Sequence, residues 1–387
     1  MRVLTVFIDM LRPNRMNTFN KNINFQNEFD LAFSDLGGTV FLNCYSPGPD
    51  TPRSISSYLT GKDPYLNGCN TRLKWPKYFL KENQRNIFDI FIDEQYKMDS
   101  FTSIKERANG IFPSAISKLD IHNHDNNLDD FLSKIELKKK HFIFISIPDF
   151  HYAFDDFGYS KKGEKDAYKL GIKAFNLIFK RFSKDDFDHI FIFSDHGFKF
   201  SFESKFESPI YLLNEDRSNC VLIHRKKFQN ETVINKKLCS LSDFYATYQD
   251  IISKKHENGY SFLRKKERKF IVIEDHINFS PEINQNIELW AVVTKDRLYL
   301  RTLNDSILID KGSRNIKYLK QLLFDNILME NSSFKKYNYE NEHIFSYKKN
   351  ILTKSEYVNG DVRKSKNKFY KVLFIIKDII SYKFSLK

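Results

Sequence analysis

Residues 190–197 read IFIFSDHG, so four large apolar side chains run directly into Ser194, Asp195, His196 and Gly197. An unbroken apolar run of this length predicts a strand buried inside a sheet. One carboxylate and one imidazole directly after such a strand suit a divalent cation such as Zn²⁺ or Mn²⁺. Gly197 then allows the backbone to turn sharply. The stretch therefore predicts a buried strand that ends in two metal-ligating side chains.

Similar apolar runs recur along the chain and alternate with longer amphipathic segments. This alternation predicts an α/β fold with a mostly parallel central sheet sandwiched between helices. The predicted strands are Val3–Ile8, Thr39–Asn43, Phe142–Ile147, Ile190–Ser194, Ile210–Leu213 and Cys220–His224. The predicted helices are Asn24–Asp35, Leu128–Ile135, Asp166–Phe182 and Leu241–Ile252.

The pattern changes towards the C-terminus, where short strand candidates follow one another with turn signals between them. These candidates are Lys269–Ile273, Leu289–Thr294, Arg297–Leu303 and Ser306–Ile309. We therefore predict a catalytic core over residues 1–265 and a small antiparallel subdomain over residues 266–330. Residues 331–387 are expected to form a polar linker, poor in regular structure as far as residue 368, and a C-terminal helix.

The C-terminal segment Lys368–Lys383 mixes apolar side chains with lysines. A basic amphipathic helix can lie in a membrane interface, with its lysines reaching towards anionic headgroups. A terminal helix that docks on the core or on a second subunit explains the same pattern. The sequence leaves both peripheral membrane association and docking open.

Composition excludes several classes of protein. The 387 residues include 38 Phe and 20 Tyr, which supply far more buriable surface than a disordered chain carries. The 13 Gly and 4 Cys do not fit collagen-like or disulfide-scaffold proteins. No run reaches the ~18 apolar residues of a membrane span. The N-terminus lacks the features of a signal peptide, so we expect a cytoplasmic location.

The net charge of +13 comes from 62 Lys and Arg against 49 Asp and Glu. Such an excess favours anionic partners, although a solvated Lys-rich surface explains it equally well. No recognised nucleic-acid-binding motif accompanies the charge, so we expect no nucleic-acid partner.

Two further polar residues follow predicted strands. Asp9 stands where the first strand stops, and ligands gather outside the carboxyl ends of strands in open α/β sheets. Thr51 precedes Pro52, which favours the first turn of a helix, and free N–H groups there attract an anion. A hydroxyl in this place can act as a nucleophile when a metal lowers its pKa. The alternative for each residue is a simple capping role.

Together Asp9, Thr51, Asp195 and His196 predict a site for one divalent metal ion, with the hydroxyl as fourth ligand. We expect Zn²⁺ or Mn²⁺, with Mg²⁺ or Ca²⁺ as alternatives.

At this combination the sequence resembles the sulfatase-like branch of the alkaline phosphatase superfamily. The order matches: an Asp near the first strand, then nucleophile-x-x-S-x-x-x-x-L-T-G, then S-D-H-G. Further segments are similar to the family over about residues 1–310, namely Leu59–Pro64 with Asn67-Gly68, Leu241–Phe244 with Thr247, Gly259–Leu263 and Ala291–Tyr299.

The resemblance also implies which branch of the family this is. Sulfatases oxidise a Cys or Ser to formylglycine, and Thr51 cannot undergo that change. Their activating Arg is replaced by Ile55, and their second N-terminal Asp by Met10. A Thr nucleophile with one metal resembles the phosphodiesterases and phosphotransferases of the family.

Asp149 and His151 follow another predicted strand, Phe142–Ile147. The family often has a substrate-contacting His here, so His151 is expected to bind a phosphoryl oxygen or to protonate the leaving group, and Asp149 is expected to contact the substrate. Alternatively, Asp149 and His151 hold a second metal, or both have a structural role.

Three cationic residues are candidates to clamp a phosphate, namely Arg12, Arg53 and Lys199. Lys199 lies close to where the family places a substrate lysine, and Asn14 is expected to help orient the site.

The sequence therefore predicts a metal-dependent phosphoryl-ester hydrolase or phosphotransferase with Thr51 as nucleophile. Its partner would be an anionic phosphate ester, by analogy a surface-glycan or lipid-linked precursor. Two alternatives stay open. One is a sulfuric ester hydrolase, and the other is a non-catalytic protein that binds an anionic polymer on the same fold.

Overall fold

The computed structural model describes two compact units, one formed by residues 1–198 and 216–271 and the other by residues 199–215 and 272–387. Within them the described residues are 1–69, 84–102, 121–123, 128–157, 161–197, 215–253, 259–278, 286–295, 299–303, 306–310, 342–348 and 351–358. Lys199, the predicted strand Ile210–Leu213 and the predicted helix within Lys368–Lys383 lie outside these residues.

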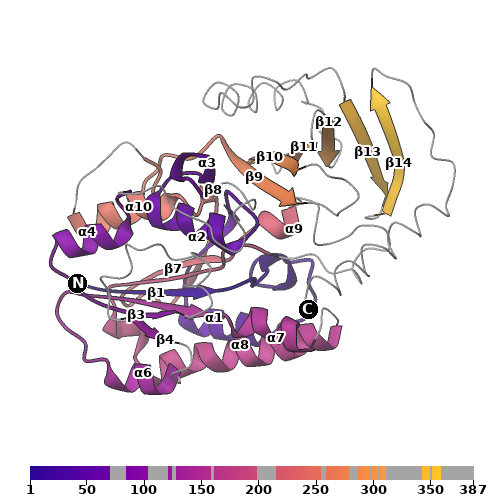
Figure 1. Ribbon diagram of the computed structural model, residues 1–387. Helices are drawn as coiled ribbons and strands as arrows, with labels where there is room; N and C mark the ends of the chain where they lie inside the picture. The colour runs from indigo at the N-terminus through magenta and orange to yellow at the C-terminus, as the bar shows by residue number, and fades with distance from the viewer. Residues whose placement is uncertain are drawn as a thin grey trace. The chain divides into compact units, whose positions relative to one another are not determined.

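The first unit is built on an eight-stranded sheet of order β4-β3-β5-β1-β6-β7-β2-β8 (Figure 1). Among the described strands of this sheet only β7 is antiparallel to its neighbours, β6 and β2. The mostly parallel α/β architecture predicted from the sequence is confirmed. The strands are β1 (Arg2–Ile8), β2 (Gly38–Tyr45), β3 (Lys97–Thr102), β4 (Ile121–Asn123), β5 (His141–Ile147), β6 (His189–Phe193), β7 (Leu222–Lys226) and β8 (Thr232–Ser240).

Strand β1 lies at the centre, parallel to β5 on one side and to β6 on the other. Phe7 is level with Ser146 of β5 and with Phe193 of β6. The segments that follow these three strands, with Asp9, His151 and Asp195, therefore start from one edge of the sheet. Strand β2, which points the same way beyond β7, leads towards Thr51.

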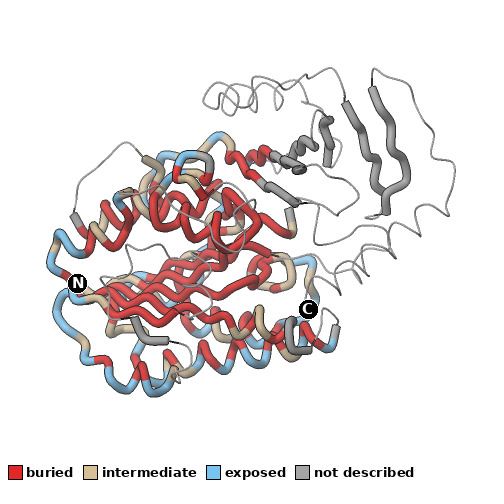
Figure 2. The backbone as a smooth tube through the Cα atoms, in the orientation of Figure 1, coloured by how far each residue is buried: buried red, intermediate tan, exposed pale blue. Residues whose placement is uncertain are grey.

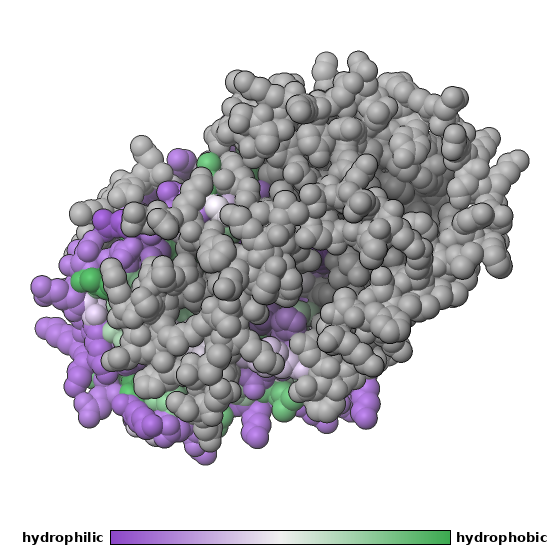
Figure 3. Space-filling model, in the orientation of Figure 1, coloured by the Kyte–Doolittle hydropathy of each residue, from purple (hydrophilic) through white to green (hydrophobic). Residues whose placement is uncertain are grey.

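Helices cover both faces of this sheet, with α2, α4 and α10 on one face and α1, α6, α7 and α8 on the other (Figure 1). The central strands β1, β5 and β6 are almost wholly buried (Figure 2), whereas the described residues on the face seen in Figure 3 are mostly hydrophilic. The helices are α1 (Glu28–Leu36), α2 (Thr51–Thr60), α3 (Pro64–Asn67), α4 (Ile87–Asp93), α6 (Leu128–Lys134), α7 (Asp149–Phe157), α8 (Lys161–Arg181), α9 (Glu215–Ser218) and α10 (Asp243–Tyr248). Each described helix is too short or too polar to cross a membrane.

Several elements differ from the sequence-based expectation. The predicted helix Leu241–Ile252 is split into α10 and a π-helical turn over Gln249–Ser253. Strands β3 and β8 were not predicted, because their sequences KMDSFT and TVINKKLCS are polar. In β8 the first residues are exposed at the edge of the sheet, so they need no apolar run.

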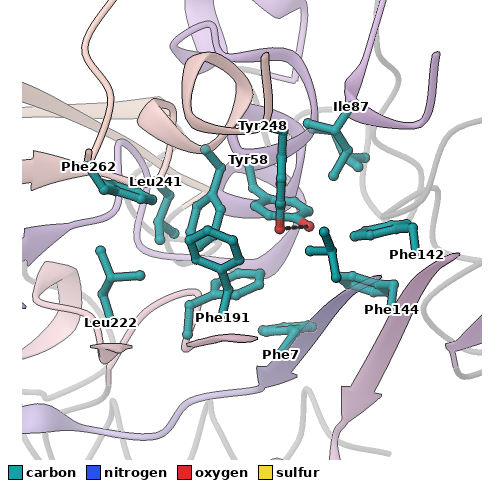
Figure 4. Packing of buried hydrophobic residues seen from close by; sticks show 14 of the residues in the cluster. Phe7, Tyr58, Ile87, Phe142, Phe144, Phe191, Leu222, Leu241, Tyr248 and Phe262 are labelled. Atoms are coloured by element: carbon teal, nitrogen blue, oxygen red, sulfur yellow. Dashed lines mark hydrogen bonds between the residues drawn. The ribbon is translucent and has the colours of Figure 1, made fainter. Parts of the chain in front are cut away.

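Aromatic side chains fill the core between the sheet and helices α2, α4 and α10 (Figure 4). The Tyr58 ring stacks on Phe193 at 4.7 Å and meets Phe244 edge-on at 4.8 Å. Two tyrosine hydroxyls enter this apolar core. The Tyr248 hydroxyl lies 2.6 Å from Thr5 Oγ1 and 3.2 Å from the Tyr58 hydroxyl, so the buried oxygens satisfy one another.

Replacing Tyr248 with Phe is expected to lower the free energy of unfolding by about 1–3 kcal/mol, because the fully buried Thr5 hydroxyl loses its partner. Tyr58→Phe is the matched control, since it removes only the longer hydrogen bond and leaves the Thr5–Tyr248 pair intact. Urea unfolding of both variants measures the difference. Equal losses for the two variants would contradict the hydroxyl chain.

A histidine pair lies further along the sheet. His189 Nδ1 and His224 Nε2 are 3.0 Å apart, and the two rings stack. Burial lowers the pKa of His189 to about 4, with Lys226 adding to the shift and Asp188 opposing it. Burial also holds the pKa of His224 well below its usual value, helped by His189 and Lys226. Both rings are therefore neutral near pH 7.

This pair makes the protein less stable in mild acid. Unfolded histidines take up protons below about pH 6.5, whereas His189 in the folded state stays neutral down to about pH 4. The contribution of neutral His189 to stability is fully present above pH 6.5 and is lost as the pH falls, by about 2 kcal/mol at pH 5. His224 acts in the same direction. The expected result is a steep loss of unfolding free energy from pH 7 to 5. His224→Phe should reduce this slope, and an unchanged slope would refute the assignment.

The second unit contains an antiparallel sheet of order β12-β11-β10-β9, in agreement with the strands predicted there. Its strands are β9 (Phe270–Asn278), β10 (Asn286–Thr294), β11 (Tyr299–Leu303) and β12 (Ser306–Asp310). An antiparallel pair, β13 (Glu342–Lys348) and β14 (Ile351–Val358), lies where the sequence predicted a polar linker without regular structure. The overlooked signal is Lys349-Asn350, since Asn favours tight turns between strands.

Candidate metal centre and active site

Three of the four predicted ligands meet at the carboxyl edge of the sheet. Asp9 follows β1, and Asp195 and His196 follow β6. One ligand atom from each of these side chains lies within 4.8 Å of the others. All three residues are buried, with Asp195 fully inaccessible. Two carboxylates and an imidazole thus converge on one point inside the protein.

The backbone orients Asp195 and His196. Asp195 Oδ1 accepts hydrogen bonds from the N–H groups of Met10 at 3.1 Å and of His196 at 2.8 Å. Met10 reaches this position with a φ of 62°, which is uncommon for a residue with a side chain. His196 Nδ1 donates to the Gly197 carbonyl at 2.8 Å, so Nε2 carries the lone pair that a metal needs.

Two carboxylate oxygens of this cluster are left without hydrogen bonds. Asp9 Oδ1 and Asp195 Oδ2 are buried and accept none from the described residues. Burial raises the pKa of Asp195 to about 6, with the Asp9 charge adding to the rise and His196 opposing it. Asp195 Oδ2 lies 3.3 Å from His196 Nε2. Buried carboxylate oxygens without a hydrogen bond, beside an imidazole nitrogen, are ligand atoms suited to a divalent cation. The residues present therefore fit one metal ion.

Thr51 joins the same cluster from helix α2. It is the first residue of the helix, and its Oγ1 lies 3.4 Å from His196 Nε2. Asp50 caps the helix by accepting the N–H of Arg53 at 3.1 Å. The Arg53 side chain is fully buried and pairs with the same Asp50 carboxylate, with Nε 2.7 Å from Oδ2. The structure thus shows Arg53 holding the cap of the helix that carries Thr51.

His151 lies in α7 and also reaches the centre. Its Nδ1 is 2.9 Å from Asp9 Oδ2, and its side chain is 29% exposed. Burial alone would raise the pKa of Asp9, but the charge and hydrogen bond of His151, with the charge of His196, hold it below its usual value. Asp149, the other residue predicted on this strand end, is the first residue of α7.

The remaining predicted substrate residues lie in the loop after β1. Arg12 is 1% exposed, and its Nη2 lies 2.6 Å from Glu164 of α8, which Arg15 also contacts. The Asn14 side-chain amide donates to Asp216 Oδ1. Glu164 therefore neutralises the positive charge of Arg12, a residue that the sequence analysis predicted to bind phosphate.

Known proteins resemble this chain in structure rather than in sequence. No protein-family model and no curated protein matches its sequence. The 2-O GAG sulfatase BT1596 superposes with a TM-score of 0.62 at 13% identity, over 87% of this chain and 92% of that one. The phosphonate monoester hydrolase from Silicibacter pomeroyi gives 0.55 at 12% identity, over 92% and 99%. That from Agrobacterium radiobacter gives 0.54 at 10%, over 88% and 97%.

This chain has the sulfatase fold. The likeness extends over most of the chain and of each matched structure, and it confirms the resemblance deduced from the motifs. The sulfatase fold of this chain places the residues after β1 and β6 and the start of α2 around one centre, as the sequence predicted for Asp9, Asp195, His196 and Thr51.

Within this sulfatase fold, helix α9 is hydrogen-bonded to the loop before Thr51 and to the loop that contains Asp195 and His196. The Arg217 guanidinium donates to the carbonyl of Pro49 at 3.3 Å, and the Arg217 carbonyl accepts the N–H of Gly197 at 2.8 Å. The Ser218 carbonyl accepts the N–H of Ser46 at 2.8 Å. Sequence reasoning missed α9, because its contacts join residues far apart in the chain and leave no local pattern.

For the reaction at Thr51 proposed below, we expect Arg217→Ala to lower kcat about tenfold, because Arg217 holds the loop that ends in Thr51 and small displacements of a reacting group are costly. Metal affinity should stay the same, because the three buried ligands follow β1 and β6 and do not belong to that loop. Arg217→Lys keeps the charge and should lose less. If kcat and metal affinity fell together, the residue would support the whole fold rather than position Thr51.

Proposed function

We propose that this protein is a metal-dependent phosphoryl-ester hydrolase or phosphotransferase with Thr51 as its nucleophile. The observation that carries the proposal is the Thr51 hydroxyl at the first residue of α2, 3.4 Å from His196 Nε2 and beside two buried carboxylates. A threonine cannot supply the formylglycine of sulfatases, so the hydroxyl itself is the available nucleophile.

Asp9, Asp195, His196 and Thr51 would hold one divalent ion, with Zn²⁺ and Mn²⁺ the best match to two carboxylates and an imidazole. A bound ion would lower the pKa of the hydroxyl and stabilise negative charge on the phosphoryl oxygens. The helix N-terminus at Thr51 adds N–H groups that favour the same anion.

In the proposed reaction the Thr51 hydroxyl loses its proton to solvent water, Oγ1 attacks phosphorus, and the bond from phosphorus to the leaving alcohol breaks. His151, fixed by Asp9, donates a proton to the departing oxygen or a hydrogen bond to a phosphoryl oxygen. The phosphothreonine then passes its phosphoryl group to water or to an acceptor alcohol. The substrates would be anionic phosphate esters, with glycan or lipid-linked precursors as the expected class.

Parallel assays test the proposal. Purified protein is treated with EDTA, resupplied with Zn²⁺ or Mn²⁺, and given an aryl phosphate, an aryl phosphodiester and an aryl sulfate. Metal-restored turnover of a phosphorus ester above that of the sulfate supports the proposal. Turnover of the sulfate alone would replace it with a sulfuric ester hydrolase, the candidate favoured by the likeness to a 2-O GAG sulfatase. Metal-independent binding of anionic polymers without turnover would favour the non-catalytic alternative.

A further inference from the structure

A cavity of about 330 Å³ lies in the first unit. Three segments line it: the turn between α2 and α3, one side of α10, and the chain from Gly259 to Arg268. Thr51 begins α2 and Gly61 follows its last residue, so a helix of ten residues, about 15 Å long, separates the cavity from the nucleophile. The cavity is therefore distinct from the metal centre.

Two glycines allow the walls to approach each other. Gly61 has a φ of 68°, and a Cβ there would lie 2.6 Å from Tyr245 Cβ. A Cβ on Gly259 would lie 3.0 Å from Ala246 Cβ. Side chains at these positions would displace α10, so the shape of the cavity depends on both glycines.

The lining carries more positive than negative side chains. Lys62, Lys266 and Arg268 stand against two carboxylates of the lining, Asp63 and Asp243. Asp243 is already engaged, because its Oδ1 binds Arg268 and its Oδ2 accepts the N–H of Ser240. Asp243 and Arg268 compensate each other, and Asp63 also lies near Arg268, so three cations against two carboxylates leave the lining with a net charge of +1.

Neighbouring side chains fix the position of Arg268. Its Nε and Nη2 bind Asp243 and Ser242, and its guanidinium lies 4.5 Å from the centre of the Tyr260 ring. Lys266 Nζ lies over the same ring at 4.8 Å. The Nη1 group of Arg268 makes no hydrogen bond among the described residues, so donors remain for an oxyanion.

We propose that this cavity binds a phosphate or sulfate group through Arg268 and Lys266. Fixed guanidinium and ammonium groups with an excess of positive charge are the chemistry that recognises a tetrahedral oxyanion. The group can come from a free ion or from a chain of phosphates. A ligand there would occupy a surface that takes no part in the reaction at Thr51.

The test compares two charge reversals at neighbouring positions. Lys266→Glu changes a residue of the lining, whereas Lys265→Glu makes the same change on an exposed residue outside it. Binding of inorganic phosphate, inorganic sulfate and a short polyphosphate is measured by titration calorimetry on EDTA-treated protein. Lys266→Glu should weaken binding at least about tenfold, and Lys265→Glu less than about twofold. If Lys266→Glu weakened the binding of polyphosphate alone, the bound phosphate group would come from a chain of phosphates and not from a free ion.

Three results would overturn the proposal. The first is a wild type that binds none of the three probes. The second is equal weakening in both variants, which would indicate only a general charge effect. The third is binding abolished by His196→Ala and unchanged in Lys266→Glu, which would place the anion at the metal centre. Turnover of an aryl phosphate should be the same in Lys266→Glu and the wild type.

Discussion

Thr51→Ala is expected to lower kcat about 10⁴-fold or more, because it removes the atom placed to form a covalent bond with phosphorus. The variant should still fold, since Asp50 caps α2 through its own side chain and the Thr51 hydroxyl is not part of that cap. It should also keep most of its metal affinity, because Asp9, Asp195 and His196 remain. Initial rates on an aryl phosphate, with metal binding measured in parallel, separate the two effects.

Thr51→Ser is the matched control for this prediction, because it keeps the hydroxyl and removes only a methyl group. It should retain a rate within about tenfold of the wild type. Mass spectrometry of protein quenched during turnover should find one phosphoryl group on the peptide that contains Thr51. Substantial activity in Thr51→Ala would show that water or another residue attacks the substrate, and the nucleophile would have to be reassigned.

The central part of the fold was predictable because burial leaves a mark in the sequence. Strands β1, β5 and β6 are buried over nearly their whole length. Their sequences are therefore largely apolar runs, which allowed them to be predicted. Strand β8 lies at the edge of the sheet, with exposed residues over its first half, and its polar sequence resembles that of a loop. Strand pairing also depends on partners distant in the chain, so the reversed direction of β7 has no local signal.

The cluster of Asp9, Thr51, Asp195 and His196 was predictable for a related reason. Its members lie within three residues of the end of a strand or start a helix, and parallel strands bring such positions to one edge. The supporting contacts were not predictable. Glu164 meets Arg12 across 152 residues of chain, and Arg217 meets Pro49 across 168. Arg53 was predicted to bind substrate from its type and place alone, whereas the structure shows its charge paired with Asp50.

Asp195→Asn is expected to make the metal-free protein more stable and to abolish stabilisation by metal. The folded state raises the pKa of Asp195 to about 6, so the ionised carboxylate destabilises the protein above that pH by about 3 kcal/mol. Asparagine removes this charge and keeps Oδ1, which accepts the N–H groups of Met10 and His196. In the wild type, saturating metal should offset the same cost, by about 4 kcal/mol at a concentration about 1,000 times Kd.

Thermal and urea unfolding with EDTA and with Zn²⁺ or Mn²⁺ measure both effects. The wild type should gain stability when metal is added. Without metal, the contribution of Asp195 should raise its stability as the pH falls from about 6 towards 4, because protonation removes the buried charge. Asp195→Asn should show neither change, and exposed Asp129→Asn should behave as the wild type. Suppose instead that Asp195→Asn destabilised the metal-free protein and that metal still stabilised the variant. Asp9 and Asp195 would then not be joint ligands of one cation. The buried cluster of Asp9, Asp195 and His196 would then be a structural ion-pair network, and the metal-dependent reaction at Thr51 would lose its basis.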